Sequence, residues 1–158
     1  MQVFLLVRIL MKIVKADLND IDEVKVIINL IYKVFSECDA IYSRESYIKK
    51  MELEYGPWYN YDTTFAILKE STLFFVAKEQ NRIIGMIRWT KDKILNFYVV
   101  KKRQWKWIGQ RLLKKFENIA KKSWSTAVRL KSSIYALNFY IKNGYTIVDN
   151  TTLIKQLI

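Results

Sequence analysis

The feature that most constrains the fold is a strand, a cationic loop and an amphipathic helix that follow one another between Ile94 and Lys122. The apolar run 94–100 predicts a strand, and the loop Lys101–Gly109 follows it. Because a helix N-terminus carries unpaired N–H groups and the positive end of a dipole, this order is suited to binding phosphates. The helix is predicted from apolar residues at helical spacing, namely Ile108, Leu112, Leu113, Phe116, Ile119 and Ala120.

Positive charge is concentrated in the same segment. Lys101–Lys122 contains nine Lys or Arg and one acid, so it carries +8 of the chain's net +12. Residues 1–62 carry a net charge of −2 and residues 63–158 a net charge of +14. A basic half is compatible with nucleic acid, membrane headgroups or an anionic cofactor, and a solvated lysine-rich surface explains part of the excess. The position of the charge favours a phosphate-bearing ligand.

Histidine and cysteine usage excludes several kinds of site. The chain has no histidine, which excludes Ser-His-Asp and Cys-His nucleophilic sites and histidine-based zinc or iron centres, so no metal site is expected. Its one cysteine, Cys38, excludes an internal disulfide and fits a reducing compartment. We therefore expect a cytoplasmic protein.

Length and composition predict one domain over residues 1–158. Hydrophobic residues make up 51% of the chain, and four Gly with one Pro leave no room for a flexible linker. No apolar run approaches the roughly 20 residues of a membrane span, so no membrane partner is expected. Met1–Leu10 has no signal-peptide cleavage site, and we expect it to extend the first strand or to pack on a neighbour, with Met11 as an alternative start.

The order of the predicted elements indicates an α/β fold with a mixed sheet. Asp20 or Asn19 can cap the first helix, and Gln80-Asn81 can close a hairpin. The expected strands cover residues 12–16, 73–78, 82–89, 94–100, 127–131, 145–148 and 152–157, and the expected helices cover residues 21–35, 43–54, 108–122 and 133–143.

The cationic loop resembles the acetyl-CoA signature of the GNAT superfamily of N-acetyltransferases, Gln/Arg-x-x-Gly-x-Gly/Ala. Gln104 fills its first position, Gly109 its last, and Val99 the strand position that precedes it by five residues. Trp107 takes the place of the middle glycine. Because tryptophan disfavours positive φ, the loop could adapt to it if the φ there is negative and the indole points outward.

A later segment resembles a second GNAT motif, in which a helix reads Asn-x-x-Ala followed by a tyrosine and then Gly-Phe/Tyr. Ser133 stands at the asparagine position, Ala136 at the alanine and Tyr140 at the tyrosine. The resemblance covers nearly all of residues 11–158. It implies the GNAT, or acyl-CoA N-acyltransferase, fold, with a mixed central sheet of about seven strands flanked by about four helices.

The resemblance also implies a site for acetyl-CoA as co-substrate. Backbone groups of Phe97 and Val99 would pair with the pantetheine and polarise the acetyl carbonyl, although both residues equally suit an ordinary buried strand. The pyrophosphate would lie over the N–H groups of residues 104–110, with Ser133 as a weaker polar contact or only a helix cap. The implied cofactor-binding residues are Phe97, Val99, Arg103, Gln104, Trp105, Lys106, Trp107, Ile108, Gly109, Gln110 and Ser133.

Tyr140 falls on the tyrosine that in many family members donates a proton to the departing thiolate of CoA. A phenol is a sensible general acid for that step, and the alternative is a packing role. Lys91 and Lys93 occupy the positions where a family glutamate often acts as base, so we expect deprotonation through water. Aromatic and acidic residues between Tyr32 and Phe65 suit a cationic amine acceptor.

Three functions remain open from the sequence. The first is acetyl-CoA-dependent N-acetylation of a primary amine on a small molecule or a protein. The second is a catalytically impaired GNAT-fold protein that binds CoA. The third is a basic nucleic-acid or ribosome-binding module that uses Trp105, Trp107 and Trp124, ranked last because no recognised nucleic-acid motif is present. A homodimer is also left open.

Overall fold

The computed structural model describes residues 11–38, 49, 66–71, 73–90, 93–104, 107–123 and 125–158. Residues 1–10 and all of the expected helix 43–54 except Lys49 lie outside this description. The described elements are β1 (Met11–Lys15), α2 (Ile21–Cys38), β2 (Leu73–Glu79), β3 (Arg82–Thr90), β4 (Lys93–Val99), the 3₁₀ turn η1 (Lys101–Arg103), α5 (Ile108–Lys122), β5 (Ala127–Lys131), the 3₁₀ turn η2 (Ile134–Ala136), α6 (Leu137–Lys142), β6 (Thr146–Ile147) and β7 (Thr152–Gln156).

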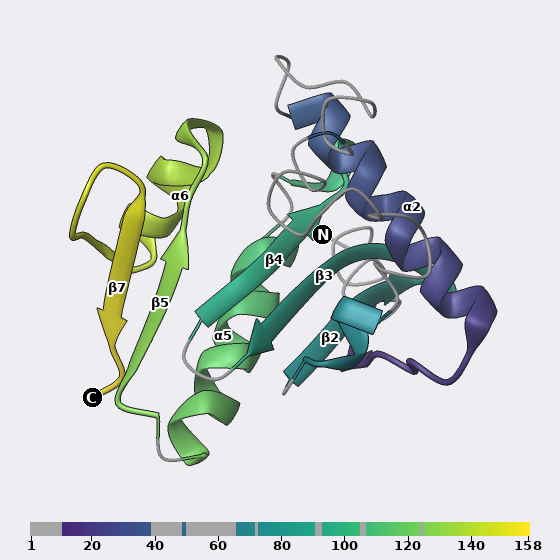
Figure 1. The fold of residues 1–158 in the computed structure, drawn as a ribbon, viewed down its shortest axis with the longest axis horizontal. Coiled ribbons are helices and arrows are strands. Elements are labelled where there is room, and N and C mark those ends of the chain that lie inside the picture. Colours follow the sequence, from purple (N-terminus) through teal and green to yellow (C-terminus); the bar gives the residue numbers. More distant parts are fainter. Residues whose placement is uncertain are drawn as a thin grey trace, which may run out of the picture.

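The strands form one mixed seven-stranded sheet in the order β1-β2-β3-β4-β5-β7-β6, as expected for the α/β class. Figure 1 labels β2, β3, β4, β5 and β7 of this sheet. The first four strands pair antiparallel, and so do the last three. The pair β4–β5 is parallel, because α5 carries the chain back across the sheet between them. This pair lies at the centre of the sheet and separates its two antiparallel halves.

The two long helices cover opposite faces of the sheet (Figure 1). On one face, α2 packs Val24, Ile28 and Ile31 against Val76 and Met86. Ile21, expected on this apolar face, is exposed instead, because it begins the helix beyond the edge of the core. On the other face, α5 buries the residues predicted from its periodicity, namely Ile108, Leu112, Leu113, Phe116 and Ala120, with Ile119 partly buried beside them.

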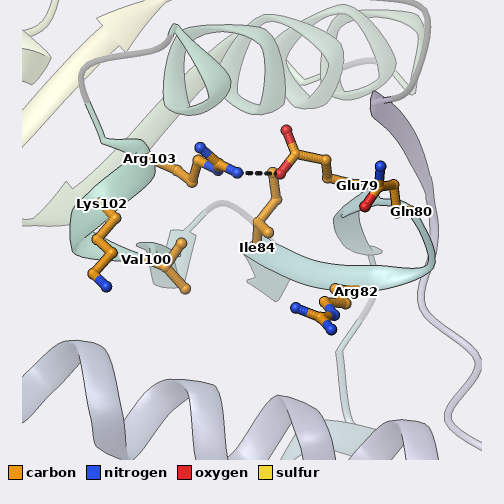
Figure 2. A pocket seen from close by; sticks show the side chains of 7 residues that line it. All are labelled: Glu79, Gln80, Arg82, Ile84, Val100, Lys102 and Arg103. Atoms are coloured by element: carbon orange, nitrogen blue, oxygen red, sulfur yellow. Dashed lines mark hydrogen bonds and ion pairs between the residues drawn. The ribbon is translucent and has the colours of Figure 1, made fainter. Parts of the chain in front are cut away.

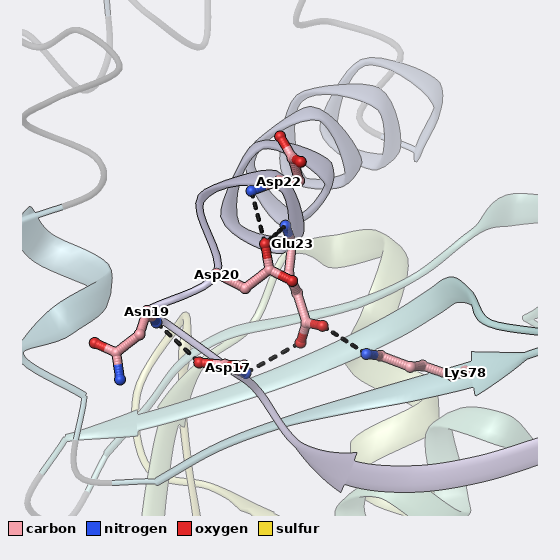
Figure 3. A network of polar contacts seen from close by, with 6 residues as sticks. All are labelled: Asp17, Asn19, Asp20, Asp22, Glu23 and Lys78. Atoms are coloured by element: carbon pink, nitrogen blue, oxygen red, sulfur yellow. Dashed lines mark hydrogen bonds and ion pairs between the residues drawn. The ribbon is translucent and has the colours of Figure 1, made fainter.

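Asp20 caps α2, as the sequence predicted. Its Oδ1 accepts hydrogen bonds from the backbone N–H groups of Asp22 and Glu23 at 3.0 and 3.2 Å (Figure 3). The Glu23 carboxylate in turn accepts from the Asp17 backbone N–H and pairs with Lys78 of β2. These contacts fix the start of α2 against the edge of the sheet.

The C-terminal third departs from the predicted boundaries. The helix expected over 133–143 is a 3₁₀ turn, η2, followed by the short α6. The Ser133 side chain accepts from the Ala136 N–H at 3.3 Å, which closes a tight turn in place of a regular first helical turn. The strand expected over 145–148 is only Thr146–Ile147, because β6 is an exposed edge strand that pairs with β7 alone.

Within the described residues, none of the helices combines the length and the apolarity that crossing a bilayer requires.

Candidate functional site

The central parallel pair opens into a gap. Strands β4 and β5 are in register only at Lys93↔Arg129 and Ile94↔Leu130. Beyond Ile94, β4 continues to pair with β3 as far as Val99, whereas its other edge has no partner on β5. The last five residues of β4 therefore have one edge free of the β5 ladder.

Backbone groups of Phe97 and Val99 face this gap. Val100 donates its N–H to Ile84 O of β3 at 2.9 Å, so the even-numbered residues at this end of β4 bond to β3. Because backbone groups alternate between the two edges of a strand, those of Phe97 and Val99 point the other way. Val99 O accepts from Gln104 Nε2 at 2.9 Å, which is consistent with this direction. The free edge of β4 thus offers the backbone groups that a pantetheine chain would need.

Aromatic rings line the same region. The Phe97 ring lies 5.6 Å from the Phe139 ring and 6.1 Å from the Tyr140 ring, and Tyr140 lies 5.6 Å from Tyr145. A Cβ built on Gly109 would meet Phe139 at 3.4 Å, an ordinary contact distance. The start of α5, the end of β4 and α6 therefore converge on one aromatic cluster.

Both tyrosines of this cluster, Tyr140 and Tyr145, are buried. Tyr145 donates to Glu117 Oε1 of α5 at 2.9 Å. Tyr140 is 6% exposed, and burial, with a smaller contribution from the nearby Tyr98, raises the pKa of its phenol well above the ordinary value. Tyr140 therefore stays protonated at neutral pH, which a proton donor requires.

The N-terminus of α5 has free N–H capacity. Trp107 makes no side-chain hydrogen bond to the first turn, and the first helical bond runs from the Arg111 N–H to Trp107 O. The N–H groups of Ile108, Gly109 and Gln110 have no acceptor within the helix, as at any helix start. With the helix dipole they make this end suited to an anion, and the pyrophosphate site that the sequence predicts here stays a prediction.

Trp107 holds a left-handed conformation, with φ 50° and ψ 14°. The negative φ that would let the loop adapt to a tryptophan is therefore not the one found. A left-handed residue turns the chain into α5 at the point where the signature has glycine, so Trp107 retains the glycine-like backbone shape. For an L residue with a Cβ this conformation costs about 1–2 kcal/mol. Trp107 itself is 39% exposed.

The strain at Trp107 predicts that a glycine there is more stable than an alanine, the reverse of their usual order in a helix. Both Trp107→Gly and Trp107→Ala remove the indole, so their stabilities differ mainly by the cost of holding the backbone in this conformation. At φ 50° we expect the Gly variant to be more stable than the Ala variant by about 1 kcal/mol. Urea unfolding of both measures the difference. An Ala variant at least as stable as the Gly variant would contradict the left-handed assignment.

Arg103 is committed to an ion pair. Its Nη2 lies 2.7 Å from Glu79 Oε2, and Figure 2 shows the guanidinium pointing toward the β2–β3 turn. A cavity of about 270 Å³ lies beside this pair, lined by Glu79, Gln80, Arg82, Ile84, Val100, Lys102 and Arg103. The expected contribution of Arg103 to a pyrophosphate site is thus reduced, since Glu79 already neutralises it. Sequence reasoning had no signal for a partner 24 residues away.

Two predicted residues form hydrogen bonds within the protein. Gln104 lies at the end of η1, where its amide joins Val99 O to the Tyr135 hydroxyl, with Tyr135 Oη 2.6 Å from Gln104 Oε1. Ser133 caps η2, which is the second of its two expected roles. Trp105 and Lys106 lie outside the described residues.

A polar network on the α2 face was not predicted. Arg88 of β3 is 4% exposed; its Nε donates to Asn96 Oδ1 at 2.8 Å, and its Nη1 donates to Ile67 O at 3.0 Å and to Ser71 Oγ at 3.3 Å. It joins β3, β4 and the segment 66–71. The strand pattern alone gave no sign that one arginine in an apolar run would be buried. The described residues hold no group of three or more His, Cys, Asp or Glu side chains arranged for a metal ion.

Comparisons with known proteins point to one family. A family model described as an acetyltransferase (GNAT) domain matches residues 57–156. No curated protein matches the chain.

Solved structures share the fold. The PaiA N-acetyltransferase of Thermoplasma acidophilum in complex with coenzyme A is 24% identical, with a TM-score of 0.67 over 91% of this chain and 96% of that one. A GNAT-family acetyltransferase of Brucella melitensis in complex with acetyl-CoA is 17% identical, with a TM-score of 0.65 over 92% and 87%. An aminoglycoside 6'-N-acetyltransferase complexed with coenzyme A is 15% identical, with a TM-score of 0.66 over 93% and 97%. At these identities the likeness establishes the fold.

Proposed function

The chain belongs to the GNAT acetyltransferase family, and we propose that it transfers an acetyl group from acetyl-CoA to a primary amine. The observation that carries the proposal is the free edge of β4, where backbone groups of Phe97 and Val99 face a gap beside Tyr140. Structures with the same fold that contain coenzyme A or acetyl-CoA support it. A single cysteine fits the cytoplasm as the place of this reaction.

In this proposal the chain binds the cofactor, stabilises the charge that develops during the reaction and donates a proton. The N–H groups at the start of α5 receive the pyrophosphate, and an N–H on the free edge of β4 stabilises the oxyanion that forms when the amine attacks the thioester carbonyl. A C–N bond forms and the C–S bond breaks. Tyr140 protonates the departing thiolate, while the amine loses its proton to water.

The decisive test is a titration of the chain with acetyl-CoA, with CoA and an RNA oligomer as comparisons, followed by an acetyl-transfer assay over a panel of amines. Acetyl-CoA binding with turnover of at least one amine supports the proposal. Binding of acetyl-CoA without turnover of any amine would favour a catalytically impaired CoA-binding protein. Tighter binding of the RNA oligomer than of acetyl-CoA or CoA would favour the nucleic-acid alternative.

A charge placed at the start of α5 should weaken acetyl-CoA binding. Gln110 is exposed in the first helical turn, so Gln110→Glu changes charge with little change in shape. One charge pair about 4 Å apart in water is worth about 1 kcal/mol, so we expect about a fivefold loss of affinity at low salt. Calorimetry at two salt concentrations measures it, and the loss should shrink at high salt.

Asn118→Asp is the matched control, because Asn118 is also exposed on α5 but lies two turns further along. We expect this variant to bind acetyl-CoA like the parent. Equal losses in Gln110→Glu and Asn118→Asp would show only an effect of net charge. An unchanged affinity in Gln110→Glu would place the pyrophosphate away from this helix end.

A further inference from the structure

Contacts of three kinds join the two halves of the sheet beyond the last β4–β5 pair. On the α5 face, Glu117 accepts from Tyr145 and pairs with Lys155 of β7. In the aromatic cluster, Phe97 contacts Phe139 and Tyr140. At the end of β4, a hydrogen bond between the side chains of Gln104 and Tyr135 also crosses the gap.

This link belongs to a continuous relay. The peptide between Val99 and Val100 is held on both sides, since its N–H donates to Ile84 O and its C=O accepts from Gln104 Nε2, each at 2.9 Å. Tyr135 then donates its hydroxyl to Gln104 Oε1 at 2.6 Å. The relay therefore runs from β3, through the last peptide of β4, to η2 on the other side of the gap.

Val99 O and the Tyr135 hydroxyl hold the Gln104 amide from its two sides. An amide oxygen can only accept and an amide nitrogen can only donate. Val99 O can only accept, so Nε2 is the group that faces it and Oε1 is left facing the Tyr135 hydroxyl, which donates. Removing that hydroxyl would take away the contact at Oε1 that helps to hold the amide against Val99 O.

We propose that Tyr135 is a positioning residue for acetyl-CoA, which acts through Gln104 by fixing the Val99–Val100 peptide and the width of the gap at the end of β4. The inference rests on the proposed function, because it gives that peptide a role beside the pantetheine. Val99 O has a second lone pair, so the bond from Gln104 leaves it able to accept one more donor. The sequence motif places Gln104 in the signature but gives Tyr135 no role.

The test is a double-mutant cycle on acetyl-CoA affinity. Tyr135→Phe keeps the ring and removes the hydroxyl, and Gln104→Met keeps the length of the side chain and removes both hydrogen bonds. One hydrogen bond contributes about 0.5–1.5 kcal/mol, so Tyr135→Phe should raise the dissociation constant about 2–10-fold. If Tyr135 acts through Gln104, the double variant should bind no more weakly than Gln104→Met alone.

The matched control is Ile134→Ala, one position earlier in η2, where the side chain is almost fully exposed. We expect parent-like affinity in this variant, and in Tyr135→Phe a raised KM for acetyl-CoA with kcat changed less than about twofold. Unchanged affinity in Tyr135→Phe, or losses that simply add in the double variant, would overturn the proposal.

Hydrogen exchange separates this inference from the proposed function. If the parent chain bound no acetyl-CoA, the proposed function would fail, but the relay would still exist in the free protein. Tyr135→Phe should then speed exchange of the Val100 amide, which donates to Ile84 O, and Ile134→Ala should not. Equal exchange at Val100 in the parent and in Tyr135→Phe would overturn the relay itself.

Discussion

A Tyr140→Phe variant is expected to fold normally, to bind acetyl-CoA as the parent does, and to lose about 10²–10⁴-fold in turnover, the usual contribution of a positioned general acid. The substitution keeps the ring that packs against Phe97, Phe139 and Tyr145. It removes only the hydroxyl. Turnover with the best amine of the panel, measured at saturating acetyl-CoA, gives the effect.

Tyr145→Phe provides the matched control. Tyr145 lies in the same cluster, but its hydroxyl donates to Glu117, so its loss should lower stability while turnover stays near that of the parent. A Tyr140→Phe variant that works at the parent rate would leave Tyr140 a packing residue, with the proton supplied from elsewhere.

The shape of the pH profile adds a second check. Burial raises the pKa of Tyr140, so the phenol remains protonated throughout the usual assay range. Tyr140→Phe should therefore lower the whole profile between about pH 6 and 9 without moving its inflections. A missing inflection in the variant would mean that Tyr140 itself titrates in that range.

The fold was largely predictable because the spacing of apolar residues within single segments predicts its main helices and strands. The apolar face of α5 and the strands β2 to β5 follow from spacing that a single segment contains. Asp20 was likewise recognisable as a cap, since capping depends on residues within one turn. The predicted helix boundaries were wrong where a local side-chain hydrogen bond competes with the helix, as the bond to Ser133 does at η2.

The site was less predictable because its contacts join distant segments. Sequence spacing placed Gln104 and Tyr140, but it could not show that Gln104 pairs with Tyr135 or that Arg103 pairs with Glu79. The conformation of Trp107 was also missed. Propensity argues against a left-handed tryptophan, and the turn into α5 imposes that conformation nonetheless.

Arg88 is the clearest residue that the sequence pattern could not explain, and its replacement should have the largest effect on stability. Arg88→Met keeps an apolar stem in the core but removes the donor to Asn96 and to the segment 66–71. Each hydrogen bond to a charged group contributes about 1.5–3 kcal/mol. Relief from burying the charge offsets part of this, so we expect a net loss of about 2–4 kcal/mol.

Thermal unfolding should show the loss as a fall in Tm of about 4–16 °C for a chain of this size. Arg82→Met is the matched control, because Arg82 lies on the same strand but is exposed, and we expect a change within about 0.5 kcal/mol. Replacing both partners removes the unpaired oxygen as well as the donor, so Arg88→Met with Asn96→Leu should recover part of the loss. A double variant less stable than Arg88→Met, or an Arg88→Met variant as stable as Arg82→Met, would show that the buried guanidinium does not hold β3, β4 and the segment 66–71 together.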